Sequence, residues 1–212
     1  ALAGKLHCSF LEPGEYADPD LPHLTWAHEE VKRRPVTPVT RRELLGFGRV
    51  LYGDGPAAFL PAVTDDQLIA FILRDLADYW RPAVSHPVRW ARDIWVDLGM
   101  LTFARASVTL DSGHLITKRE ALDVLERVLG APAEVVADIR ARRYGGEHRG
   151  DPLWILRRAR LTRGFLRGGI DDVLRNGGAQ FGSELALAPR GEREEGCPGF
   201  WGQREYRAGL VL

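Results

Sequence analysis

This chain contains little cysteine or methionine, and neither sign of charge is in excess. Its 212 residues include only two cysteines, Cys8 and Cys197, and one methionine. Two cysteines are too few for a disulfide framework, which favours a reducing compartment, and we expect a cytoplasmic protein. The 29 Lys and Arg residues are matched by 29 Asp and Glu residues. Because no net charge attracts nucleic acid or an anionic membrane, we expect neither as a partner.

Long hydrophobic runs are missing as well. A helix that spans a bilayer needs about 20 consecutive apolar residues, and the sequence contains neither such a stretch nor the pattern of a signal peptide. The hydrophobic fraction of 45% and the charged fraction of 27% are those of an ordinary globular protein. The chain is long enough to bury a sizeable core. We expect a monomer that binds a small molecule.

Helix signals dominate the middle of the chain. Three segments have the form of a capping box, in which a threonine and an acidic or amide side chain satisfy backbone amides at a helix start: Thr40–Glu43, Thr64–Gln67 and Thr117–Glu120. In the second of these helices apolar residues recur every four positions, at Leu68, Ile72, Leu76 and Trp80. We expect Pro82 to end that helix, because proline cannot donate the next hydrogen bond.

Further helices are predicted from apolar periodicity and from caps. They cover residues 88–110, 117–129, 132–144 and 151–176. Apolar residues occur on nearly every face of the first, which is typical of a central helix packed on all sides. The fold class is therefore predicted to be mainly α, a bundle of five or six helices over residues 40–176.

The two ends of the chain differ from this helical domain. The segment KLHCSFL at 5–11 is predicted to be a strand, and a second short strand is expected around Trp26–Val31. The chain opens on ALAGKLHCSFL without an initiator methionine, so residues 1–39 are interpreted as the remnant of a larger domain and a linker. Residues 177–212 have no helical period and are rich in glycine and charge, which predicts an irregular, disordered tail.

Three residues could form a binding site for a polyphosphate. Arg105 interrupts the apolar central helix, Lys118 begins the next helix, and Tyr144 ends a later one. A guanidinium and an ammonium group bind phosphate oxygens, and a tyrosine ring offers a stacking surface. The alternatives are structural: Arg105 could pair with Asp97 or Asp111, Lys118 could be solvated, and Tyr144 could belong to the core.

The spacing of these residues belongs to a longer set of motifs. The set comprises LTFAR at 101–105, Thr109, Gly113, Thr117-Lys118 and Ala121, preceded by VLYGDGPAAFLPAV at 50–63 and DDQLIAFILRDLADYW at 65–80. In order and spacing it resembles the helical C-terminal domain of aminoglycoside nucleotidyltransferases, and most of all that of streptomycin/spectinomycin 3''-adenylyltransferases. The resemblance extends over residues 6–175.

The resemblance implies a function for the whole enzyme. Members of this family transfer AMP from ATP, with Mg²⁺, to a hydroxyl of a cationic aminoglycoside, and their helical domain closes over the nucleotide. By position, Arg105, Lys118 and Tyr144 correspond to the nucleotide contacts. Neither the Gly-Ser turn nor the Asp-x-Asp pair that bind phosphate and metal in this family precedes Leu6, and Asp18-Pro-Asp20, which has the letters of the pair, lies in a proline-rich loop rather than on a strand. We therefore assign no metal ligand, regard no cofactor as certain for this chain, and expect it to be inactive alone.

The remaining site predictions concern the base and the substrate. His7 lies on the strand where the family presents its general base, although a strand histidine with a purely structural hydrogen bond is the alternative. Trp90, Asp93 and Asp97 could bind a cationic substrate through an aromatic face and two carboxylates. The helix dipole alone would also favour acids at a helix start. The alternative function is a non-catalytic helical binding or interaction module.

Overall fold

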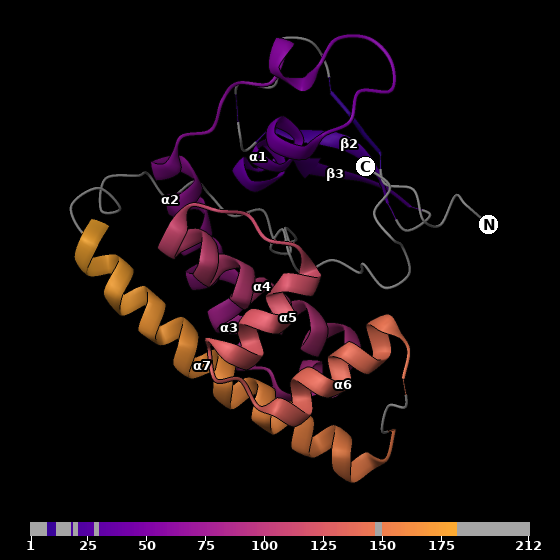
Figure 1. The fold of residues 1–212 in the computed structure, drawn as a ribbon, viewed down its shortest axis with the longest axis vertical. Helices are drawn as coiled ribbons and strands as arrows, with labels where there is room; N and C mark the ends of the chain where they lie inside the picture. The colour runs from indigo at the N-terminus through magenta and orange to yellow at the C-terminus, as the bar shows by residue number, and fades with distance from the viewer. Residues whose placement is uncertain (1–7, 12–17, 19–20, 28–29, 147–149, 182–212) are drawn as a thin grey trace. The chain divides into compact units, whose positions relative to one another are not determined.

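The structure is a computed structural model, and it describes residues 8–11, 18, 21–27, 30–146 and 150–181. The described part is mainly α-helical with a small antiparallel sheet near its N-terminal end (Figure 1). The predicted fold class, a helical bundle with a short strand-bearing N-terminal segment, is confirmed. His7 and the predicted disordered tail from residue 182 onward lie outside the described residues. Contacts divide the chain between Phe71 and Ile72 into two units.

The N-terminal unit contains the sheet. Its strands, in the order β1-β2-β3, are β1 (Cys8–Phe10), β2 (Pro22–Ala27) and β3 (Glu30–Pro35). β1 lies within the predicted strand 5–11, but the prediction of a single strand at Trp26–Val31 is wrong. Trp26 ends up on β2 directly opposite Val31 on β3, because the chain reverses between them. Alternation of side chains could not reveal that reversal, since it continues on both sides of a hairpin.

The first helix begins earlier than its predicted cap. Helix α1 (Pro38–Phe47) is capped by Thr37, whose hydroxyl accepts a hydrogen bond of 3.3 Å from the backbone N–H of Thr40. The predicted cap at Thr40 is therefore wrong. Pro38 explains the shift, because its fixed backbone angle suits the first position of a helix. The chain continues through the 3₁₀ turn η2 (Pro56–Ala58).

Helix α2 (Asp65–Asp75) begins at the predicted capping box. The backbone N–H of Gln67 donates to the hydroxyl of Thr64 at 3.2 Å, and the backbone N–H of Thr64 donates to the side chain of Gln67 at 3.1 Å. The helix does not end at Pro82. It passes into a π-helical turn, η3 (Leu76–Trp80), and then into α3 (Arg81–Val84). The wider π turn accommodates a ring that would clash in a regular α-helix.

The second unit is built on long helices. They are α4 (Asp93–Ser112), α5 (Lys118–Arg127), α6 (Ala133–Tyr144) and α7 (Pro152–Phe181), with the 3₁₀ turn η4 (Pro87–Ala91) before α4. Helix α4 packs against α5 and α7, and α6 packs against the same two helices (Figure 1). Every residue from Val96 to Ala104 is buried, as predicted for a central helix. Gly99 is required there, because a Cβ atom would lie 2.7 Å from the ring of Trp90.

Helix α7 is longer than predicted. Its start is the predicted one, since the Asp151 carboxylate accepts a hydrogen bond of 2.8 Å from the backbone N–H of Trp154. Its end lies at Phe181, beyond the predicted Asn176, so the two glycines of GGAQF do not stop it. Among the described helices, none is long and apolar enough to cross a membrane.

Candidate functional site

The corner between α4 and α5 is held together by Arg105. From the second half of α4, its Nε donates a hydrogen bond of 2.8 Å to the carbonyl oxygen of Ile116, two residues before Lys118. The Thr109 hydroxyl lies 2.9 Å from the Arg105 carbonyl oxygen. Gly113 ends α4 with φ of 71°, a left-handed conformation that favours glycine. These contacts fix the path of the chain from Arg105 to Lys118.

The first turn of α5 is fixed by its capping box. The backbone N–H of Glu120 donates to the Thr117 hydroxyl at 3.2 Å, and the Glu120 carboxylate accepts from the backbone N–H of Thr117 at 2.8 Å. This backbone hydrogen bond lowers the pKa of Glu120, because it stabilises the carboxylate. Lys118 is the first residue of the helix and is half-buried. The predicted cap is confirmed, and it holds the backbone of Lys118 in place.

Tyr144 reaches the same corner from the end of α6. The guanidinium of Arg119, the residue after Lys118, lies 4.7 Å from the centre of the Tyr144 ring. Such a cation–π contact places the ring beside the first turn of α5. The Tyr144 side chain stays 44% exposed. Arg105 is thus linked to Ile116 and Tyr144 to Arg119, at positions on either side of Lys118 along the chain.

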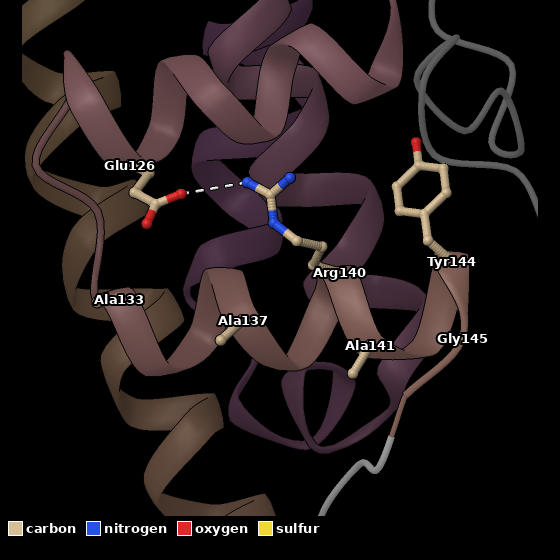
Figure 2. A pocket seen from close by; sticks show the side chains of 7 residues that line it. All are labelled: Glu126, Ala133, Ala137, Arg140, Ala141, Tyr144 and Gly145. Carbon is tan, nitrogen blue, oxygen red and sulfur yellow. Dashed lines mark hydrogen bonds and ion pairs between the residues drawn. The ribbon is translucent and has the colours of Figure 1, made fainter.

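A groove of about 400 Å³ runs from Tyr144 along the surface between α5 and α6. It is lined by Glu126, Ala133, Ala137, Arg140, Ala141, Tyr144 and Gly145 (Figure 2). Arg140 lies between the two helices, where it donates hydrogen bonds of 3.1 Å to Asp123 and to Glu126 on α5. The hydrogen bond to Asp123, above all, raises the pKa of Arg140. The groove therefore has an aromatic end at Tyr144 and a carboxylate at Glu126.

The three residues predicted to bind substrate have structural contacts. Trp90 is completely buried, and its indole N–H donates to the Ala83 carbonyl oxygen at 3.0 Å. Asp97 is likewise fully buried. Asp93 is partly exposed but pairs with Arg158 at 2.6 Å. In this structure Trp90 and Asp97 have no surface to offer a substrate, because both lie inside the helical core.

Asp97 belongs to a buried ionic network that the predicted sites do not include. Arg142 on α6 donates to Asp97 on α4 and to Asp138 one turn earlier on α6. Arg158 on α7, which is fully buried, donates to the same Asp138 at 3.1 Å. The indole N–H of Trp154 also donates to Asp138, at 3.3 Å. The network therefore ties three helices together.

Burial sets the electrostatics of this network. It raises the pKa of Asp97 to about 6, although the nearby guanidinium of Arg142 acts in the opposite direction. Burial alone would lower the pKa of Arg142, but the charges of Asp97 and Asp138 outweigh it and raise that pKa. The sequence contained one indication of this network, because Asp138 and Arg142 are four residues apart, which is the spacing of an ion pair on a helix.

The chemistry that the corner supports is binding of an anionic, partly aromatic ligand. Guanidinium and ammonium groups neutralise phosphate oxygens, and an exposed tyrosine ring stacks on a base. Within the described ranges, no group of three or more His, Cys, Asp and Glu side chains could hold a metal ion. Comparison with protein-family models, with curated proteins and with solved structures finds no match to this chain.

Proposed function

We propose that this chain is the nucleotide-closing helical part of an adenylyltransferase. The whole enzyme transfers AMP from ATP to a hydroxyl of a cationic, aminoglycoside-like substrate. The observation that carries the proposal is the α4–α5 corner, where Arg105 is hydrogen-bonded two residues ahead of Lys118 and Tyr144 stacks on Arg119. The motif resemblance over residues 101–121 selects the same corner independently of this geometry.

Each residue of the corner has a distinct role in this proposal. Lys118 supplies a compact positive charge at a helix N-terminus, where the backbone amides also favour anions. Arg105 supplies a second cation whose position is fixed by its bond to Ile116. Tyr144 offers a partly exposed ring to the base of the nucleotide. Together these groups bind and orient the triphosphate, and the cations stabilise the pyrophosphate as it leaves.

The transfer step itself is assigned to a part of the enzyme that the described residues do not supply. They contain no group of three or more His, Cys, Asp and Glu side chains that could hold a metal ion, and His7, the predicted base, lies outside them. ATP supplies the AMP group, and Mg²⁺ is expected from the resemblance for the whole enzyme. We therefore expect this chain to bind nucleotide weakly and to catalyse no transfer alone.

Calorimetric titration with ATP and Mg²⁺ tests the proposal. We expect Arg105→Ala and Lys118→Ala each to weaken binding about tenfold, which corresponds to one charge-assisted contact. Arg160→Ala is the matched control, because Arg160 is an exposed arginine on α7, outside the corner. Circular dichroism confirms that each variant is folded. Undiminished binding by both corner variants would contradict the proposal.

A non-catalytic helical binding module is the second candidate function. The burial of Trp90 and Asp97 favours it, because two of the three expected substrate contacts are enclosed in the core. A gene-level observation separates the two functions. An in-frame Gly-Ser turn and Asp-x-Asp strand encoded upstream of Ala1 would support the enzyme. A translation start at Ala1 would support the module.

A further inference from the structure

The three-stranded sheet has one apolar face and one polar face. In an antiparallel sheet, residues directly opposite one another point to the same side. The apolar face is made of three rows of paired residues, Pro22–Pro35, Phe10–Leu24–Arg33 and Cys8–Trp26–Val31. The other face carries rows of polar residues, Ser9–Thr25–Lys32 and His23–Arg34.

The burial of these two faces is the reverse of what their composition predicts. On the apolar face, Phe10 is 64% exposed, Leu24 is 42% exposed and Val31 is 62% exposed. On the polar face, His23 and Thr25 are only 4% and 6% exposed. A sheet with one face in solvent normally turns its polar face outward. Clustered apolar side chains left on a surface mark a site of interaction.

The dimensions of the apolar face indicate what covers it. Three strands about 4.8 Å apart form a strip about 10 Å wide, which is the diameter of one α-helix with its side chains. A second copy of the chain is a poorer fit. A stable interface between two folded chains takes about 20 residues from each partner, whereas the three rows offer eight, which is enough only for the narrower and weaker contact of a single helix. One helix laid across the strands covers the whole face.

The charge on this face indicates the composition of that helix. Arg33 is exposed in the row with Phe10 and Leu24, and it forms no ion pair within the part of the chain that the structure describes. The polar face differs, because there Lys32 pairs with Glu30 at 2.7 Å. A guanidinium at the rim of an apolar surface selects a partner that places a carboxylate opposite it.

We propose that the apolar face of the β1–β2–β3 sheet is a docking surface for one amphipathic helix of a partner polypeptide. The apolar stripe of that helix covers Phe10, Leu24 and Val31, and one of its carboxylates pairs with Arg33. This inference is independent of the proposed nucleotide site, since all of its residues lie in the N-terminal unit.

A synthetic amphipathic peptide provides the probe. It carries leucine at helical positions i, i+3, i+4 and i+7 with flanking glutamates, and a scrambled peptide of the same composition is its control. Binding to the full chain is measured by fluorescence anisotropy. We expect micromolar binding of the amphipathic peptide, and binding at least tenfold weaker for the scrambled one. Equal affinity for both peptides, or no binding at millimolar concentration, overturns the proposal.

Two variants of the chain test the geometry. Val31→Lys places a charge in the apolar face and should weaken binding at least tenfold, whereas Leu153→Ser, which changes a leucine 79% exposed on α7, should not. Arg33→Glu should weaken binding of the glutamate peptide and restore it when the glutamates are replaced by lysine. If the lysine peptide does not bind Arg33→Glu more tightly than the glutamate peptide does, the proposed pairing of Arg33 with a carboxylate of the helix is wrong. A concentration-dependent dimer that Val31→Lys abolishes assigns the face to a second copy instead and also overturns the proposal.

Discussion

The helical unit and the N-terminal sheet differ in which side chains they bury. The core of the helical unit contains fully buried charges, Asp97 and Arg158, which lie within one network of ion pairs and hydrogen bonds. The sheet instead exposes apolar side chains and covers polar ones, such as His23. Hydrophobicity alone therefore predicts burial in neither region. In the helices, complementary charges make burial tolerable, and in the sheet a covering partner would have to restore the expected pattern.

The largest expected effect comes from breaking the buried network. Arg142→Met at pH 7 should lower the free energy of unfolding by about 3–5 kcal/mol, because Asp97 and Asp138 lose a shared partner while remaining buried. Urea denaturation followed by circular dichroism measures the change. Arg160→Met is the control, since that arginine is exposed on the same bundle. Equal stability of the two variants would show that the network contributes nothing.

The burial of Asp97 should also make the stability of the chain depend on pH. The pKa of Asp97 is raised from 3.8 to about 6 in the folded chain, so folding favours its protonated form. That contribution is complete below pH 4 and is lost as the pH rises through about 6. Relative to Asp97→Asn, the wild-type chain should therefore lose up to about 3 kcal/mol of stability between pH 4 and pH 7. Parallel curves for the two proteins, measured in urea at each pH, would contradict the raised pKa.

A smaller effect is expected in the N-terminal unit, at the cap of α1. Thr37→Ala should destabilise the chain by about 1 kcal/mol, because it removes the hydroxyl that accepts from the backbone N–H of Thr40. Thr40→Ala leaves that acceptor in place and should cost less. Thermal denaturation of the two variants compares them. A larger loss of stability in Thr40→Ala than in Thr37→Ala would show that Thr40, and not Thr37, caps the helix.

The smallest effect is expected on the open face of the sheet. Val31→Thr keeps a β-branched side chain at a position that is 62% exposed. It should change the free energy of unfolding by less than about 0.5 kcal/mol, as surface substitutions do. Chemical denaturation measures this change. A loss of 2 kcal/mol or more would mean that Val31 is buried in the free chain, and it would remove the contrast between the two regions.

Local signals were predictable from the sequence, whereas contacts between distant residues were not. The caps at Thr64, Thr117 and Asp151 depend on residues three positions apart, and all three are confirmed. The cap at Thr40 was wrong because Thr37 followed by proline is a competing start of equal quality. The fold class followed from helical periodicity in the same way.

In the candidate site, too, the residues marked by local patterns were predictable and the contacts between distant residues were not. Arg105, Lys118 and Tyr144 could be selected from the sequence, and in the structure Arg105 contacts Ile116 and Tyr144 contacts Arg119, on either side of Lys118 along the chain. The contact of Arg142 with Asp97 joins residues that are 45 positions apart, so no local pattern could reveal it. For the same reason Asp97, which looked like a surface acid near a helix start, lies inside the core.

The π-helical turn at Leu76–Trp80 has a consequence for the phase of its helix. Apolar residues recur every four positions from Leu68 to Val84, and every member of this series is buried: Leu68, Ile72, Leu76, Trp80 and Val84. A regular α-helix has 3.6 residues per turn, so a spacing of four drifts by about 40° at each step and would carry the series around the axis. The wider turn absorbs part of that drift. Deleting one residue within it would convert the turn to a regular α turn and leave the segments on either side in nearly the same rotational phase, whereas a deletion in a regular part of the helix would rotate one segment by about 100° relative to the other.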